Sequence, residues 1–246
     1  MRFRLRVSLF ITCLVDQLWP SVGASAVEVL RRAGCEVVFD ERQTCCGQPA
    51  FNTGYRGEAR RLARRFIEIF EGSKADAVVS PSGSCTAMAH RFHELFQDDP
   101  EWRHRAEALA ARTHEFGSFL VNVLGVEDVG ASFRGRVTWH DACHGLRDLN
   151  IHGEPRKLLR GVRGLEFVEL QNADSCCGFG GTFSVKYPEI SVAILDNKIE
   201  AIERANVRAV VSGDASCLMQ IGGRLTRKGS TVRAMHLAEL LAAKES

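Results

Sequence analysis

The 246-residue chain lacks several features that would assign it to a common class of protein. Its 32 basic and 30 acidic residues leave almost no charge excess, so few free cations are available to neutralise a nucleic-acid backbone. It has no run of about 18 apolar residues, the length that a membrane-spanning helix needs. The glycine spacings of a dinucleotide-binding fingerprint and of a P-loop are also missing. We therefore expect no nucleic-acid partner, no transmembrane segment and no NAD, flavin or ATP.

What the chain does contain is nine cysteines, too few for a small disulfide scaffold and too regularly placed to be incidental. Eight of them form two sets of the same design, in which a lone cysteine, an adjacent pair followed by glycine, and another lone cysteine occur in that order. The sets are Cys13, Cys45, Cys46 and Cys85, and then Cys143, Cys176, Cys177 and Cys217. Corresponding members lie 130 to 132 residues apart. The ninth, Cys35, adjoins an apolar run and is expected to be a buried thiol.

Other segments repeat with the same period; Ala77–Ser80, for example, recurs as Ala209–Ser212. A period of this length indicates duplicated domains rather than a solenoid. Each half alternates short β-rich runs with helical patterns, which predicts parallel strands joined by right-handed crossovers. We predict an α/β fold of two tandem, pseudo-symmetric subdomains, each with a mainly parallel sheet flanked by helices. Their bounds are 1–124 for the first, 125–134 for a linker and 135–246 for the second.

The individual elements follow from hydrophobic periodicity. Strands are expected at 7–11, 36–39, 77–80, 137–139, 166–168 and 209–211. Helices are expected at 24–33, 58–70, 116–124, 188–205 and 237–243.

The N-terminus has some features of a secretory signal, with three arginines ahead of an apolar run and a small-x-small sequence at Ala24–Ala26. However, Arg6–Cys13 has a counterpart deep in the chain at Arg136–Cys143. The second copy cannot be a signal, so the first is interpreted as a folded strand. We therefore expect a cytoplasmic protein.

The positions of the cysteines point to metal ligation. The lone cysteines follow β-rich runs, and ligands of parallel sheets gather beyond the carboxyl ends of the strands. A disulfide between adjacent cysteines would be strained, because neighbouring α-carbons lie only about 3.8 Å apart. Both thiols of a pair can address one metal from a turn, which the following glycine permits. We therefore assign all eight cysteines as metal ligands, and the cofactor-binding residues as Gly47, Gly178, Gly180 and Gly181.

Four cysteines per half suit either zinc or an iron–sulfur cluster. Structural zinc usually takes two short Cys-x-x-Cys-like knuckles. Here the gaps are 32 and 39 residues in the first half, and 33 and 40 in the second. This spacing favours iron–sulfur clusters, of the [4Fe–4S] kind and one per half, because a wider cage accepts ligands from separate loops. Whether the clusters are cubane or non-cubane stays open, and a zinc-binding scaffold is an alternative.

The twice-repeated Cys…Cys-Cys-Gly…Cys pattern resembles that of cysteine-rich CCG domains, such as the cluster-binding subunits of heterodisulfide reductases. Segments including CCGQPAFNTGY (45–55) and CCGFGGTFSVK (176–186) resemble most closely the lactate utilization protein A family of CCG-domain iron–sulfur proteins. The resemblance implies an iron–sulfur electron-transfer component of an L-lactate oxidation system that yields pyruvate, as a non-flavin subunit of an oxidoreductase complex. It also implies two partner proteins of that system, one of which carries further clusters.

The chain departs from the broader CCG pattern in one respect. The heterodisulfide-reductase type ends each motif in Cys-x-x-Cys, whereas Ser82 and Asp214 occupy the first of these positions here. Each half thus offers four thiolates rather than five. Asp214 is a candidate oxygen ligand, and Ser82 is expected to cap the following helix. A heterodisulfide-reductase-like thiol–disulfide function is the alternative to electron transfer.

Three further residues are candidates for catalysis. His140 and His144 flank Cys143, while the first half has Phe10 at the position of His140. Imidazole can shuttle a proton at neutral pH or ligate a metal, so we expect the second site to be the more chemically active. Lys186 follows the glycine-rich loop, where its ammonium group is available to an anion.

Overall fold

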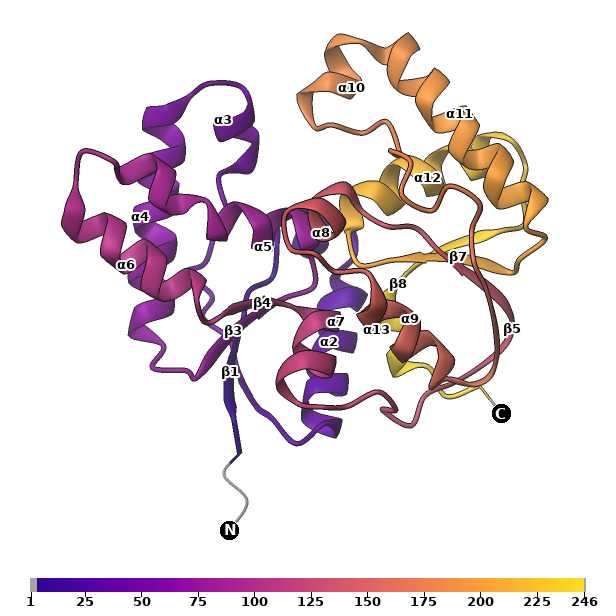
Figure 1. The fold of residues 1–246 in the computed structure, drawn as a ribbon, viewed down its shortest axis with the longest axis horizontal. Coiled ribbons are helices and arrows are strands. Elements are labelled where there is room, and N and C mark those ends of the chain that lie inside the picture. The colour runs from indigo at the N-terminus through magenta and orange to yellow at the C-terminus, as the bar shows by residue number, and fades with distance from the viewer. Residues whose placement is uncertain (1–3, 246) are drawn as a thin grey trace.

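The computed structural model describes residues 4–245, and its framework is a pair of four-stranded parallel sheets (Figure 1). The first sheet has the order β2-β1-β3-β4 and the second has the order β6-β5-β7-β8. The strands of the first are β1 (Arg6–Leu9), β2 (Glu36–Val38), β3 (Ala77–Ser80) and β4 (Thr113–Glu115). Those of the second are β5 (Ser132–Trp139), β6 (Arg163–Val168), β7 (Ala209–Ser212) and β8 (Arg233–His236). The predicted α/β fold with two repeated sheets is confirmed.

The six expected strands are present, and the two that the sequence did not predict, β4 and β8, are the last strand of each sheet. Both are short and polar, as in Thr113–Glu115, so neither shows an apolar run. The N-terminal expectation is confirmed for Arg6–Leu9, which pairs with both β2 and β3. Residues 1–3, at the start of the segment with some features of a signal, lie outside the described residues.

Helices connect the strands in both halves. In the first half they are α1 (Cys13–Leu18), α2 (Pro20–Arg32), α3 (Gln48–Asn52), α4 (Arg56–Gly72), α5 (Gly83–His90), η1 (Phe92–Phe96), α6 (Pro100–Ala110), α7 (Phe116–Ser118) and η2 (Phe119–Val123). In the second half they are α8 (Cys143–Arg147), α9 (Gly153–Arg160), α10 (Thr182–Lys186), α11 (Pro188–Arg204), α12 (Ala215–Arg227) and α13 (Leu237–Ala242). The helices expected from periodicity correspond to α2, α4, α7 with η2, α11 and α13.

The two halves share a single central core. Helix α2 of the first half packs against α13 at the C-terminal end of the chain, and α7 packs against α9 (Figure 1). Buried side chains of both sheets and of these helices, such as Leu30, Phe116 and Leu240, form one continuous apolar cluster. Helices that lie on one face of each sheet therefore pack against helices of the other half, so neither half completes its apolar core alone.

The expected linker at 125–134 overlaps a strand. β5 begins at Ser132, and Phe133 is only 1% exposed, because this side chain belongs to the shared core. The non-strand connection therefore ends at Ala131, three residues before the expected end of the linker. The division into subdomains at 1–124 and 135–246 stays a prediction.

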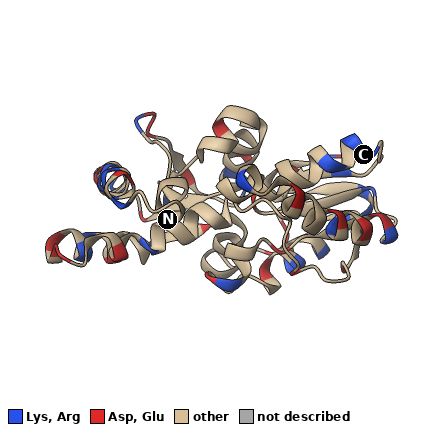
Figure 2. Ribbon diagram, turned by 90° about the horizontal axis from the view of Figure 1, so that it is seen from above, with Lys and Arg blue, Asp and Glu red and all other residues tan. Residues whose placement is uncertain are grey.

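The helices at the periphery carry both signs of charge side by side (Figure 2). Ion pairs such as Arg105 with Glu71 link neighbouring helices, in keeping with the near-neutral net charge. Within residues 4–245, no helix combines the length and the apolarity needed to cross a bilayer.

Candidate metal centres

The four repeated cysteines of the first half meet beyond the carboxyl ends of β1 and β3. Cys13 begins α1, the adjacent pair lies in the turn before α3, and Cys85 lies in the first turn of α5. The Sγ atoms of Cys13 and Cys45 are 3.8 Å apart, and those of Cys46 and Cys85 are 3.4 Å apart. The fold thus gathers thiols that are up to 72 residues apart in the sequence.

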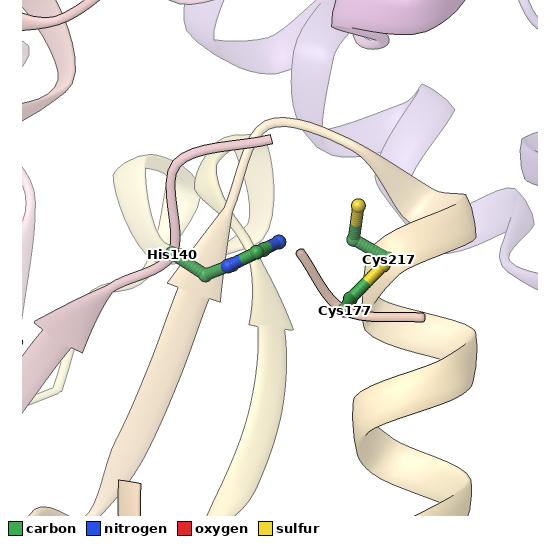
Figure 3. Close-up of side chains that lie close together, drawn as sticks. All are labelled: His140, Cys177 and Cys217. Carbon is green, nitrogen blue, oxygen red and sulfur yellow. The ribbon is translucent and has the colours of Figure 1, made fainter. Parts of the chain in front are cut away.

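The second half repeats this arrangement at the ends of β5 and β7. Cys143 begins α8, and Cys217 lies in the first turn of α12. The Sγ atoms of Cys177 and Cys217 and a ring nitrogen of His140 all lie within 4.8 Å of one another (Figure 3). All nine cysteines are free thiols, and Cys35 is buried away from both sets, as expected.

One thiol of each set is strongly acidified by its neighbours. Hydrogen bonds from Cys13 and Cys46 and from the backbone N–H of Gly47 lower the pKa of Cys45 far below its usual range. The Cys176 thiol has its pKa lowered in the same way, by Cys143, by Cys177 and by the N–H of Gly178. Each set therefore holds a thiolate at neutral pH, the form that binds metals and acts as a nucleophile.

The glycine after each cysteine pair shapes the turn. Gly47 and Gly178 adopt φ values of 84° and 82°, which favour glycine, and each donates its N–H to the first cysteine of the pair. At Gly178 a Cβ atom would lie 2.4 Å from the carbonyl oxygen of Ser191 in α11. At Gly178 the close approach is thus to the protein's own backbone, and both glycines hold the turn from which two adjacent thiols point to one place.

Both sets of cysteines line the same cavity, which has a volume of about 420 Å³ and runs across the boundary between the halves. Gly180, Gly181 and His144 also line it, whereas His140, Gly47, Gly178 and Lys186 do not. The sequence predicted two separate sites, one per sheet. The structure instead places them face to face across one space.

Asp214 and Ser82, the residues at the positions of the missing cysteines, hold helix ends. Ser82 Oγ accepts a hydrogen bond from Cys85 N–H, so Ser82 is the expected cap of α5. Asp214 Oδ1 accepts from the N–H and hydroxyl of Ser216, while Oδ2 accepts from the N–H of Ser84 in the other half. Because both carboxylate oxygens are engaged in this way, Asp214 caps two helices, and we do not include it among the proposed ligands.

The three candidate catalytic residues lie in different settings. His140 is fully buried behind Cys177 and Cys217, at the end of β5. His144 is on the cavity wall, where its Nδ1 pairs with Asp148 at 2.6 Å and its Nε2 faces the Gln48 amide of the other half at 3.5 Å. Lys186 is exposed at the end of α10, outside the cavity lining, so the structure does not bring it to the other two.

Two buried ionisable residues close to the site were not anticipated. Lys198 of α11 is fully buried, and its Nζ donates to the carbonyls of Asn172 and Ala173, just before the second cysteine pair. Arg156 pairs with Asp141, which adjoins His140. Lys198 is detectable in the sequence as a cation on the apolar stripe that contains Leu195 and Ile199. Arg156 has no comparable signal.

The donor set fits iron–sulfur clusters or a thiolate-bound metal. Each half presents four thiols from three separate loops, at least one of them acidic, at helix N-termini that stabilise negative charge. Cys13, Cys45, Cys46 and Cys85 would hold the first centre, and Cys143, Cys176, Cys177 and Cys217 the second. His140 adds a nitrogen donor to the second set alone.

The chain is similar in sequence to known proteins of one family. The model of the cysteine-rich domain family, CCG, matches residues 7–89 and 137–222. Lactate utilization protein A of Exiguobacterium sp. is 52% identical over 235 residues, covering 96% of each chain. That of Bacillus subtilis is 52% identical over 237 residues, covering 96% of this chain and 99% of the relative. Among solved structures, a putative Asp/Glu racemase from Yersinia pestis aligns over 97% of the chain at 11% identity, with a TM-score of 0.36.

Proposed function

The chain belongs to the CCG cysteine-rich domain family and, within it, to the lactate utilization protein A family, and on this basis we propose that it is an iron–sulfur electron-transfer component of an L-lactate oxidation system. The proposed system converts lactate to pyruvate. We further propose that the chain works with two other lactate-utilisation proteins, one of them an iron–sulfur subunit, and that it is located in the cytoplasm.

One observation carries this proposal: two four-cysteine sets line a single cavity. When bound there, iron–sulfur clusters supply sites that accept and release single electrons. Placing both sets on one cavity brings the two centres close to each other and to any small molecule between them. The acidic thiols Cys45 and Cys176 are prepared for metal binding, since little free energy is needed to deprotonate them.

The residues around the thiols orient them. Gly47 and Gly178 direct an N–H to the first cysteine of each pair, and hydrogen bonds to cluster sulfurs adjust the potential. His144 lies on the cavity wall with Asp148 holding its Nδ1–H, which leaves Nε2 as an acceptor. This arrangement suits His144 for accepting a proton from a molecule in the cavity.

The first test is chemical analysis of anaerobically purified chain for iron, acid-labile sulfide and zinc, with an electron paramagnetic resonance spectrum of the same sample. About eight irons and eight sulfides per chain are expected for two [4Fe–4S] centres. Stoichiometric zinc without sulfide would contradict the electron-transfer proposal and support the scaffold alternative.

The second test is functional and uses the chain together with its two partners. Replacing Cys176 and Cys177 by serine is expected to halve the iron content and to abolish lactate-dependent electron transfer. Cys35→Ala is the matched control, because this thiol is buried outside both sets and the variant should keep its full iron content. Wild-type lactate oxidation by the double-serine variant would rule out the proposal.

The cavity also favours a second candidate function, reduction of a disulfide bound between the two centres. A volume of about 420 Å³ admits a small organic molecule. In that reaction a disulfide would take up two electrons and two protons and leave as two thiols. Reduction of a mixed disulfide by the isolated, prereduced chain would favour this function, and its absence would exclude it.

A further inference from the structure

Different side chains lie behind the two metal centres, although the backbone around the centres is equivalent. The N–H of Phe10 donates to the carbonyl of Val79 at 2.9 Å, and the N–H of His140 donates to that of Val211 at 2.8 Å. These hydrogen bonds join corresponding strands, so Phe10 and His140 occupy the same position in the two halves. A fully buried phenyl ring in one half is thus replaced by a fully buried imidazole in the other.

A second side chain that differs between the halves lies next to the first. The helices α4 and α11 are equivalent and both have 17 residues, and Phe66 and Lys198 occupy the same position in them. In the first half, the rings of Phe66 and Phe10 pack edge to face with centroids 4.7 Å apart. In the second half, the Lys198 ammonium group donates to the carbonyls of Asn172 and Ala173, a few residues before the cysteine pair. The first centre therefore rests on an aromatic pair and the second on two nitrogen-bearing side chains.

Neither Nδ1 nor Nε2 of the His140 ring has a hydrogen-bond partner of ordinary geometry within the described residues, although the ring faces the Cys217 thiol. A buried polar atom without a partner is costly, by about 1–3 kcal/mol, and is rare unless a ligand satisfies it. The ring points from the end of β5 toward Cys177 and Cys217, and a ring nitrogen lies within 4.8 Å of both sulfurs (Figure 3). An atom held between the three would satisfy the imidazole.

We propose that His140 is a nitrogen ligand of the second metal centre, binding beside Cys177 and Cys217, so that the two centres of the chain are chemically different. The inference rests on the proposed function, since it requires that a metal centre be held by these cysteines. It adds that the first centre is bound by thiolates alone and the second by thiolates and an imidazole.

The two centres are also expected to differ in potential. Both are held by four thiolates, and the neutral imidazole adds no negative charge to the second. The buried ammonium group of Lys198 lies beside the second centre alone, and a nearby cation stabilises the reduced, more negative form. The second centre is therefore expected to have the higher potential.

The test uses the full chain, purified anaerobically, labelled with ¹⁵N-histidine and reduced with dithionite. Pulsed electron paramagnetic resonance of the wild type should show the hyperfine coupling of a metal-bound nitrogen, and the label should change its isotope pattern. A spectrum without histidine nitrogen coupling in a chain that carries iron and sulfide would overturn the proposal. This measurement needs no variant, so it holds even if a substitution impairs folding.

Two variants locate the nitrogen. His140→Phe copies the residue of the first half and should lose the coupling. His144→Gln is the matched control, because His144 is the neighbouring histidine on the cavity wall, and it should keep the coupling. Loss of the coupling in His144→Gln instead would overturn the assignment to His140.

Failure of the proposed function can be told apart from failure of this inference. If the chain binds zinc and no sulfide, the electron-transfer proposal fails, and ligation is then measured on Co²⁺-substituted protein. His140→Phe should shift the visible absorption bands of bound Co²⁺, and His144→Gln should leave them in place. Unchanged bands in His140→Phe would overturn the inference with this metal as well.

Discussion

Asp214 joins the two halves of the molecule, because its Oδ2 accepts a 2.8 Å hydrogen bond from the backbone N–H of Ser84, 130 residues earlier in the chain. Its Oδ1 meanwhile accepts from Ser216 in its own half. One carboxylate therefore holds the N-termini of α5 and α12, the two helices that carry Cys85 and Cys217 into the shared cavity.

Removal of this carboxylate is expected to loosen both helix ends. Asp214→Ala should lower the free energy of unfolding by about 2–3 kcal/mol, because it removes a helix cap and a charge-assisted hydrogen bond. Asp214→Asn keeps a capping oxygen and should cost less. Urea unfolding of the reduced apoprotein measures both. Both variants should bind as much iron as the wild type. Loss of iron in Asp214→Asn, which keeps a capping oxygen, would show that Asp214 is a ligand.

The halves are in close contact where α5 meets α8. A Cβ atom on Gly83 would lie 3.2 Å from the Cα and 3.3 Å from the N of Gly145, which are backbone atoms of the other half. Gly83→Ala should therefore destabilise the protein by about 1–3 kcal/mol, since it overpacks a tight contact. Gly57→Ala is the control at an exposed position of α4, where only the end of the Arg61 side chain lies within 4.0 Å of the added Cβ, and it should be neutral or stabilising. Equal effects of the two variants in thermal unfolding would contradict the close contact.

The loop that carries His140 is held by a buried ion pair. Arg156 donates to both oxygens of Asp141, at 2.9 and 2.8 Å, and only 7% and 3% of the two side chains are exposed. Arg156→Met should cost about 3–5 kcal/mol, because it leaves a buried carboxylate without its partner. In contrast, Arg204→Met breaks an exposed pair with Glu200 and should cost less than about 0.5 kcal/mol. Urea midpoints of the two variants give the comparison, and similar values would argue against the buried pair.

Stability should fall as Glu115 ionises. Burial raises the pKa of this carboxyl to about 7, and the negative charges of Glu154 and Asp214 add to the rise. Hydrogen bonds from the N–H groups of Ser118 and Gly117 lower the pKa, but by less than burial raises it. Because the pKa in the folded state is above that in the unfolded state, the stabilisation is complete at low pH and is lost as pH rises through 7.

Glu115→Gln removes this dependence while keeping an acceptor for Ser118 N–H. Relative to the wild type, the variant should gain up to about 3 kcal/mol of stability between about pH 5 and pH 8. Urea unfolding of the two apoproteins at both pH values measures the difference, in which the titration of the cysteines cancels. A difference that does not change with pH would contradict the raised pKa.

The sequence alone determined the features that depend on local pattern. Hydrophobic periodicity located six strands and five helical segments, though not α6 or α12, because backbone geometry sets which side chains share a face over a few residues. The repeat predicted two equivalent sheets. The glycine after each cysteine pair indicated a turn, and both Gly47 and Gly178 have the positive φ that a turn of this kind needs. The spacing of the thiols likewise predicted that each set would converge.

Tertiary structure alone decided how the halves meet. Short-range periodicity carries no signal for burial between residues more than 100 positions apart. Such burial decides that α2 packs against α13 and that both cysteine sets line one cavity. The same holds for single side chains. The sequence marked His140 as a residue beside a cysteine, but only the packing of β5 and α12 deprives its ring of hydrogen-bond partners and directs it at two thiols.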